Sequence, residues 1–217
     1  MTSAWTLGVL RSAGAPCPHE VVKLGGSLLG MEDWPTRVAE LVRDRAVRRP
    51  VLIVVGGGAI VDGLRTIDGA APQDATVMHD LAIALMGTTA RVVAAALSVP
   101  LVVECPRMAA AVLDVPHWLA AADHGDRLPV GWHVTSDSIA ACVAATTGGD
   151  LLLAKRVPPP ASSGAHLLEV LTSSGWVDGH FARAAASLQG IAWASPRSVP
   201  VPCVGGPGVD GGDTLGR

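Results

Sequence analysis

The sequence predicts an α/β fold in which helices cover a mostly parallel β-sheet. Two short apolar runs, Glu20–Leu24 and Val51–Val55, each end at glycines and each precede a helix-like segment. The continuous β-branched run of the second is typical of a strand buried on both faces. Strands that alternate with helices in this way predict a layered sheet. Hydrophobic residues make up 49% of the 217 residues and charged residues 16%, which excludes a disordered chain.

Glycine, proline and capping residues divide the chain into elements. Residues 1–18 have no clear period, which predicts a loose leader ahead of a single domain over residues 19–217. Asp33 as N-cap and Pro35 in the first turn mark the start of one helix. Pro100 ends the longest segment in which apolar residues recur with a helical period. Helices are expected at about 33–48, 59–67, 74–98, 107–115, 135–147, 165–172 and 179–188. Further strands are expected at about 101–103, 151–154 and 191–194, with a candidate last strand at 199–204.

The composition argues against several partners and compartments. A net charge of −3 gives no reason to expect nucleic acid or an anionic membrane as partner. No uncharged apolar run reaches the roughly 18 residues of a membrane span, and the N-terminus lacks a signal core. The four cysteines are scattered and are interpreted as reduced thiols of a cytoplasmic protein, with a disulfide or a metal site as the alternative. They are Cys17, Cys105, Cys142 and Cys203.

One lysine lies inside the first predicted strand, directly before a glycine turn. Lys23 is followed by Gly25, Gly26 and Ser27, and burying an unpaired ammonium group is costly. Glycines allow a phosphate to approach the backbone closely, and helix N-termini direct N–H groups toward it. The pattern favours a phosphate site with Lys23 as its cation. The alternative is a solvent-exposed lysine on an edge strand.

A second glycine turn follows the second predicted strand. Gly56, Gly57 and Gly58 supply backbone donors but no side-chain chemistry, and a plain flexible turn is the alternative interpretation. Neither a Walker-type loop nor a GxGxxG pattern occurs at this turn, so a dinucleotide site is not supported here. Beside the Lys23 turn, the second turn favours an anion site.

Polar residues at two later places extend this prediction. Ser136 and Asp137 open a helix, either as an ordinary cap or with Asp137 at the carboxyl edge of the sheet, where it would orient Lys23. Lys155 and Arg156 follow a predicted strand, which suits contact with phosphate but is also common for a solvated pair.

Two more features are ambiguous by spacing alone. Asp178 begins a helix as a candidate N-cap, and Arg183, one turn further on, is a candidate second cation for a transition state. His79 and Asp80 lie in the long helix, where a surface pair is favoured over a contact with substrate. The histidines lack HxxxH-type spacing, which argues against a zinc enzyme.

Together these stretches resemble the amino acid kinase superfamily, which includes acetylglutamate, aspartate and uridylate kinases. The resemblance covers about residues 20–194 and is carried, in family order, by Val22–Ser27, Val55–Gly58, Thr135–Ala141 and Leu151–Lys155. Within the superfamily, Trp132–Ser138 and Trp176–Phe181 are most similar to the aminomethylfuranmethanol-phosphate kinases of methanofuran biosynthesis.

The resemblance implies a three-layer αβα sandwich around a mainly parallel sheet, the amino acid kinase or carbamate kinase-like fold. It places the acceptor at the N-terminal half and ATP at the C-terminal half, with Mg²⁺ held mainly by the nucleotide. The implied reaction moves the γ-phosphoryl group to the phosphate of an aminomethylfuran methyl phosphate. The catalytic candidates are Lys23, Asp137, Lys155 and Arg183. The candidates for binding the nucleotide and its phosphates are Gly25, Gly26, Ser27, Gly56, Gly57, Gly58, Ser136, Arg156 and Asp178.

Other functions on the same fold stay open. The acceptor could instead be an amino acid, a nucleoside monophosphate or an isoprenoid phosphate. A non-catalytic binding or storage protein is the alternative from another class, because Arg156-Val157-Pro158 replaces the Val-Asp-Gly that family members usually carry after Lys155. A homo-oligomer is expected in either case.

Overall fold

The computed structural model of the chain describes residues 4–12, 17–105, 108–121, 128–161 and 166–197. Its strands are β1 (Trp5–Arg11), β2 (Glu20–Leu24), β3 (Val51–Val55), β4 (Leu101–Val102), β5 (Ala110–Leu113), β6 (Asp150–Ala154) and β7 (Ile191–Pro196). Its helices are the 3₁₀ helix η1 (Gly26–Gly30) and the α-helices α1 (Trp34–Ala46), α2 (Gly58–Ala70), α3 (Ala75–Leu97), α4 (Val115–Ala120), α5 (Ser136–Thr147), α6 (Leu167–Ser173) and α7 (Phe181–Ala184).

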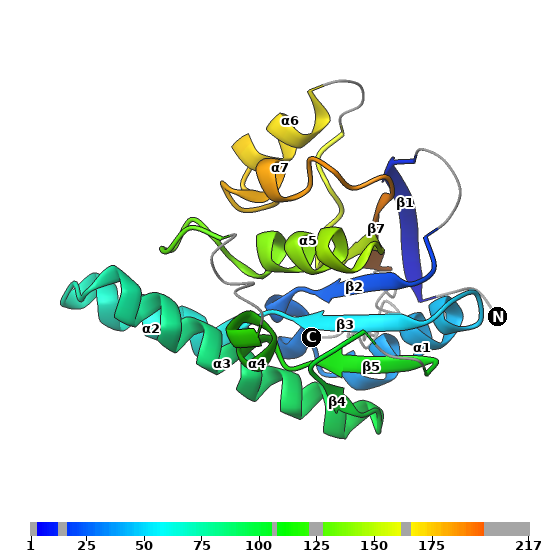
Figure 1. Ribbon diagram of the computed structural model, residues 1–217, viewed down its shortest axis with the longest axis horizontal. Helices are drawn as coiled ribbons and strands as arrows, with labels where there is room; N and C mark the ends of the chain where they lie inside the picture. Colours follow the sequence, from blue (N-terminus) through cyan, green and yellow to red (C-terminus); the bar gives the residue numbers. More distant parts are fainter. Residues whose placement is uncertain (1–3, 13–16, 106–107, 122–127, 162–165, 198–217) are drawn as a thin grey trace, which may run out of the picture.

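The described strands form one sheet in the order β1-β7-β6-β2-β3-β5-β4. Neighbouring strands are parallel except for β1, which pairs with β7 in the antiparallel sense. Every residue of the central strands β2 and β3 is buried, as expected for a sheet covered on both faces. The predicted mainly parallel α/β fold is therefore confirmed. Figure 1 shows β2, β3 and β5 pointing toward the end of the molecule where α2 lies.

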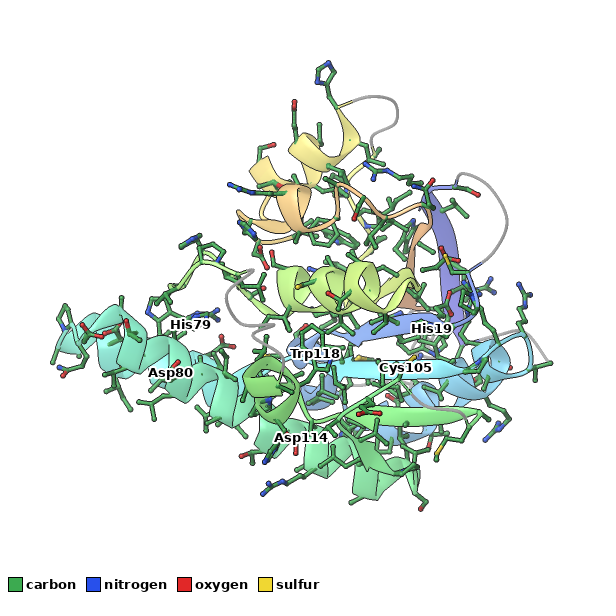
Figure 2. All side chains as sticks on the ribbon, in the orientation of Figure 1. His19, His79, Asp80, Cys105, Asp114 and Trp118 are labelled. Atoms are coloured by element: carbon green, nitrogen blue, oxygen red, sulfur yellow. The ribbon has the colours of Figure 1, made fainter. Side chains whose placement is uncertain are left out.

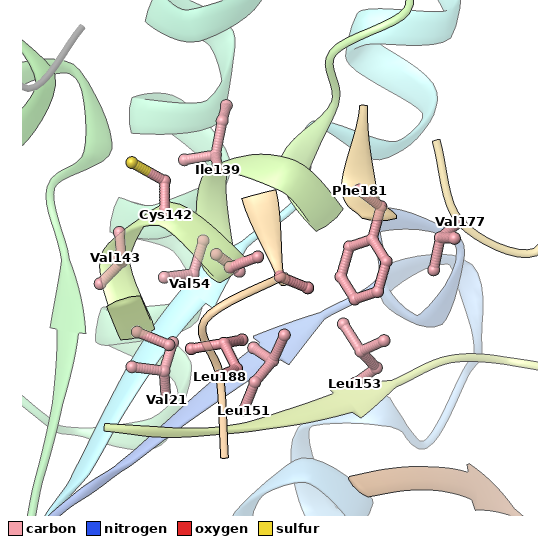
Figure 3. Packing of buried hydrophobic residues seen from close by; sticks show 14 of the residues in the cluster. Val21, Val54, Ile139, Cys142, Val143, Leu151, Leu153, Val177, Phe181 and Leu188 are labelled. Atoms are coloured by element: carbon pink, nitrogen blue, oxygen red, sulfur yellow. The ribbon is translucent and has the colours of Figure 1, made fainter. Parts of the chain in front are cut away.

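Alternation along β2 sends successive side chains into two different cores. Val22 and Leu24 join the core that includes residues of α1 and α3, whereas Val21 joins the core formed with α5 and α7. Lys23 shares the parity of Val21 and therefore emerges on the face covered by α5. Figure 3 shows this second core, which includes Val21, Ile139, Val143, Leu151, Leu153 and Phe181.

Two segments correct the sequence prediction. The loose leader predicted for residues 1–18 contains β1, which pairs with β7 far along the chain and has no strong local signal. The helix predicted at about 107–115 contains β5, because Ala110–Leu113 is buried beside β3 and this burial overrides the helix propensity of alanine. The candidate strand at 199–204 lies outside the described residues.

The amino-terminal end of the sheet is closed by a buried ion network. Glu20 is 1% exposed and accepts hydrogen bonds from Arg45 at 2.6 and 2.7 Å and from Arg49 at 2.9 Å. Arg49 also pairs with Asp150. Figure 2 shows His19 at this end of the sheet and His79 at the opposite end. Because these acidic and basic groups pair with one another, this end is held by ion pairs from β2, α1 and β6.

Among the described helices, α3 is long and apolar enough to cross a membrane by length and composition. In this structure it packs against α1, α2, α4, β3 and β5. Part of its apolar surface is therefore used in the core of the domain. Its Thr89 is buried and donates a hydrogen bond to the carbonyl oxygen of Gly56, which ties α3 to the turn after β3.

Candidate active site

The two glycine turns pack directly against each other at the carboxyl ends of β2 and β3. A Cβ atom on Gly26 would lie 2.1 Å from the backbone nitrogen of Gly58, and one on Gly56 would lie 2.8 Å from Ser136 Oγ. Gly58 also has a φ of +57°, a conformation that favours glycine. Close approach of the two backbones therefore requires glycine here. Any ligand at this place meets bare backbone.

The N–H groups of these turns have different partners. Gly25 donates to the carbonyl oxygen of Ala154 at 2.8 Å, and Gly56 donates to that of Leu24 at 2.9 Å. These two N–H groups continue the pairing of the sheet, so they are not the phosphate donors predicted from the sequence. No described side chain caps the first turn of α2 at Gly57. The N-terminus of α2 is therefore the better anion donor.

Lys23 and Lys155, the only lysines in the sequence, meet at one buried aspartate. Lys23 Nζ lies 2.8 Å from Asp137 Oδ1, and Lys155 Nζ donates to Asp137 Oδ2 at 2.7 Å. Lys23 is 4% exposed and Asp137 is 5% exposed. Within the described residues Asp137 Oδ1 has no well-aligned hydrogen-bond donor, so its contact with Lys23 is an ion pair by distance. The sequence prediction that Asp137 lies beside Lys23 agrees with this geometry.

Neighbouring elements bring these three groups together. β2 and β6 are parallel neighbours in which Lys23 pairs with Leu153, and Lys155 comes two residues later, with the same parity. Lys155 Nζ also donates to the carbonyl oxygen of Trp176 and lies 4.8 Å from the centroid of the Trp176 ring. Asp137 lies in the first turn of α5, over the same face of the sheet.

The charges of the cluster shift the pKa values of its members. Burial alone would raise the pKa of Asp137, but Lys23 and Lys155 outweigh it and the pKa is lowered. Burial and the positive charge of Lys23 lower the pKa of Lys155 to about 8, although Asp137 opposes this shift. With both lysines protonated the cluster carries one net positive charge. Such a cluster is suited to an anion.

Asp178 caps the helix that carries Asp137. Its carboxylate accepts hydrogen bonds from the backbone N–H groups of Thr135 at 2.9 Å and Ser138 at 3.0 Å. It also accepts from both hydroxyls, with 2.8 Å to Thr135 Oγ1, and from the N–H of His180 at 3.0 Å. A carboxylate therefore already occupies the N-terminus of α5. The structure thus places Asp178 as a cap, though of α5 and not of the helix that follows it, and the predicted contact with nucleotide stays a prediction.

A cavity of about 200 Å³ opens beside the glycine turns. Its walls come from the two glycine turns, the start of α5, the helices α2 and α3, and the turn at Gly131 and Trp132. Its lining includes Gly26, Ser27, Gly57, Gly58, Asp62, Arg65, His79, Trp132 and Ser136. The predicted glycines 26, 57 and 58 and both predicted serines therefore meet at one cavity.

Comparison with models of protein families relates part of the chain to one known family. Residues 20–113 match the model of the amino acid kinase family. The matched segment runs from β2 to β5 and includes Lys23 and both glycine turns, which supports a place in the amino acid kinase superfamily. No curated protein matches the sequence significantly.

Solved structures share the amino acid kinase fold. The uridylate kinase from Archaeoglobus fulgidus has 17% identity and a TM-score of 0.55, over 80% of this chain and 99% of that chain. The UMP kinase from Ureaplasma parvum has 15% identity and a TM-score of 0.53, over 79% of this chain and 86% of that chain. The aspartate kinase from Synechocystis has 16% identity and a TM-score of 0.52, over 82% of this chain and 40% of that chain. At these identities the likeness shows the fold alone.

Two predicted cations lie apart from the lysine cluster of this amino acid kinase fold. Arg183 is exposed on the short helix α7 and lines a different cavity with Cys142 and Thr146. Thr146 is nine residues beyond Asp137 on α5, which corresponds to about 13 Å along the helix axis. The predicted role of Arg183 as a second catalytic cation is therefore not supported by its position. Arg156 is exposed after β6.

Several residues of the site were not singled out from the sequence. The Trp176 carbonyl that binds Lys155 has no sequence signature of its own, since any residue presents a carbonyl. Trp132 Nε1 donates to Asp68 Oδ2 at 2.7 Å, across 64 positions of the chain. One signal was available. The chain has only two lysines, one near the end of a predicted strand and one directly after another, and this pattern points to both at once.

Proposed function

We propose that this chain is an ATP-dependent small-molecule kinase whose acceptor is itself a phosphate, namely an aminomethylfuran methyl phosphate. The observation that carries the proposal is the Lys23–Asp137–Lys155 cluster beside two packed glycine turns and a cavity. Phosphoryl transfer requires mainly positioning and neutralisation of charge. This cluster offers one net positive charge in a buried setting, where electrostatic stabilisation is strong.

Each residue of the cluster has a distinct proposed role. ATP, when bound, supplies the γ-phosphoryl group. Lys23 and Lys155 stabilise negative charge on the transferred group. Asp137 fixes the direction of both ammonium groups and opposes the loss of the Lys155 proton. The N–H groups at the start of α2 bind phosphate oxygens. Asp178 holds α5 and therefore positions Asp137. No general base is needed, because an acceptor phosphate is already deprotonated.

The side chains near the site also indicate which groups would hold Mg²⁺. No three histidine, cysteine, aspartate or glutamate side chains gather at one place among the described residues. Mg²⁺ commonly binds substrate phosphates and water, with only one or two protein carboxylates. Asp137 is already engaged by two lysines. We therefore propose that the nucleotide phosphates hold Mg²⁺ here, in a cytoplasmic and homo-oligomeric enzyme.

A kinase of nucleoside monophosphates is the second candidate. The structural neighbours named as UMP and uridylate kinases favour it, and the fold alone does not decide between the acceptors. A binding protein without transfer activity is the third, motivated by Arg156-Val157-Pro158 after β6.

The test compares wild type with Lys23→Ala and Asp150→Asn in a coupled assay of ADP formation. Each acceptor, the aminomethylfuran methyl phosphate or UMP, is added at saturating ATP and Mg²⁺. Loss of one transition-state cation predicts a rate about 100-fold lower for Lys23→Ala. Asp150→Asn, at the other end of the sheet, serves as the control and should keep most of the rate. Undiminished turnover by a folded Lys23→Ala variant would contradict the assigned role of the lysine.

A further inference from the structure

The ammonium group of Lys155 meets the same tryptophan in two ways. Its Nζ donates to Asp137 Oδ2 at 2.7 Å and to the backbone carbonyl oxygen of Trp176, and it lies 4.8 Å from the centroid of the Trp176 ring. An ammonium group has three N–H donors, so these two acceptors leave one donor for a ligand. Lys23 differs, because within the described residues it pairs with Asp137 and has no cation–π contact.

The backbone of Trp176 is held between two helices. Its N–H donates to the carbonyl oxygen of Leu171 in α6 at 3.0 Å. Two residues later, Asp178 accepts hydrogen bonds from the start of α5. Gly175, which precedes the tryptophan, has a φ of +69°, a conformation that favours glycine. These contacts keep the Trp176 carbonyl oxygen beside Lys155.

The indole of Trp176 also contacts the loop that follows Lys155 in the sequence. Trp176 is 8% exposed, and its Nε1 donates to the backbone carbonyl oxygen of Val157 at 3.1 Å. Three consecutive prolines follow at 158–160, and a proline ring fixes φ, which limits the freedom of this loop. The loop therefore holds the ring, while the ring lies beside the ammonium group.

The physical effect of these contacts is on the direction of a long side chain. A lysine side chain has a flexible four-carbon stem and loses much rotamer freedom when it is fixed. Asp137 attracts the Lys155 ammonium, but the same carboxylate also pairs with Lys23. An aromatic ring within about 6 Å stabilises a cation, and more so where water is excluded. The indole and the carbonyl therefore restrict an ammonium group whose carboxylate partner is shared.

We propose that Trp176 is a positioning residue that holds the Lys155 ammonium group at Asp137 and couples it to the loop after β6. The ring acts on Lys155, and the hydrogen bond to Val157 holds the ring. The proposal rests on the proposed function in one respect, namely that Lys155 acts on the transferred phosphoryl group. The positioning itself requires no substrate.

Exchange of lysine ammonium protons with water tests the positioning without ATP or acceptor. Protein labelled with ¹⁵N at lysine Nζ is studied by NMR at about pH 6, as wild type, Trp176→Leu and Trp176→Phe. Trp176→Leu should speed the exchange of the Lys155 protons about 10-fold, as expected for loss of a desolvated cation–π contact. Trp176→Phe keeps a ring but loses the bond to Val157, so its rate should lie between those of wild type and Trp176→Leu.

Two controls separate positioning from general loosening of the fold. The sequence has only two lysines, so the Lys23 signal in each variant is an internal reference and should change less than about twofold. Trp34→Leu is the matched control, because Trp34 on α1 packs against the core on the opposite face of the sheet. This variant should leave the exchange of both lysines unchanged.

Three results would overturn the proposal. One is an unchanged Lys155 rate in folded Trp176→Leu protein, and another is equal acceleration of both lysines. The third is a wild-type rate in Trp176→Phe, which would remove the role of the Val157 bond. Trp176→Phe keeps an aromatic core residue, so it gives this result even if the leucine variant does not fold.

A separate transfer assay distinguishes this proposal from the proposed function. If Lys155 acts in the transition state, Trp176→Leu should lower kcat about 10-fold and leave the KM for ATP unchanged. The predicted exchange rates in a wild type that transfers no phosphate would contradict the kinase assignment and leave the positioning role intact. Wild-type exchange rates in both Trp176 variants of an active kinase would contradict the positioning role alone.

Discussion

Replacing Asp137 with asparagine removes the one carboxylate that two buried lysines share. Both contacts are short, at 2.8 Å for Lys23 and 2.7 Å for Lys155. At an effective dielectric constant of about 20, each corresponds to roughly 6 kcal/mol of Coulomb energy before the cost of desolvation. Removing one partner of a buried pair costs about 3 to 5 kcal/mol net. The chain can avoid part of this cost by releasing a proton from a lysine.

Lys155 is the lysine expected to release that proton. Its pKa is already lowered to about 8 by burial and by Lys23. Asp137 is the neighbour that opposes this shift, so losing its carboxylate charge should lower the pKa of Lys155 further. If the protonated form is required, the transfer rate of wild type falls as pH rises through about 8. In Asp137→Asn this fall should occur at correspondingly lower pH.

The assay uses the fact that the sequence has only two lysines. Protein labelled with ¹³C at lysine Cε gives one signal for Lys23 and one for Lys155, and a pH titration by NMR follows each directly. The Lys155 signal, assigned with Lys155→Arg, should titrate near pH 8 in wild type and lower in Asp137→Asn. Asp150→Asn is the control. An unchanged Lys155 titration in folded Asp137→Asn protein would refute the electrostatic reasoning.

Three further predictions concern residues around the site and the opposite end of the sheet. Asp178→Ala removes the cap of α5 and should lower the free energy of unfolding, measured in urea, by about 2 kcal/mol. The control Asp33→Ala removes no capping hydrogen bond from α1 and should change this free energy by less than about 0.5 kcal/mol. Equal effects of the two would argue against the capping role. Arg183→Ala should keep kcat within about twofold of wild type, because the side chain is exposed beside the later turns of α5. A loss of tenfold or more would show that Arg183 takes part in the reaction. Arg45→Ala should lower the free energy of unfolding by about 2 kcal/mol and leave KM unchanged. The loss is limited because Glu20 keeps Arg49 as a partner. A melting temperature equal to that of wild type would contradict a stabilising role of the ion network.

The sequence predicts the carboxyl edge of the sheet well because its signals are local. Lys23 stands in an apolar run before glycines, and Asp137 opens a helix with capping residues. Since parallel strands end at the same edge, these groups were expected to meet, and they do. Lys155 was expected at the same edge for the same reason, and the structure places it on Asp137.

Other features depend on partners far along the chain and have no such signal. β1 is an edge strand defined by its pairing with β7, and β5 is an alanine-rich run whose burial beside β3 outweighs local propensity. Arg183 was expected one turn into a longer helix, but α7 is short, and Arg183 lines a cavity with Cys142 and Thr146 in the later turns of α5. The contact of Trp132 with Asp68 joins a turn to a helix that neither segment specifies alone.

The most direct test of the central claim is to observe the transferred phosphate. Wild-type protein is incubated with ATP, Mg²⁺ and the aminomethylfuran methyl phosphate, and the products are followed by ³¹P NMR. A kinase that phosphorylates a phosphate predicts the coupled doublets of a new diphosphate, in a one-to-one ratio with ADP, and their absence with Lys23→Ala. ATP binding without a new diphosphate from this acceptor, UMP or any other phosphate would contradict the claim.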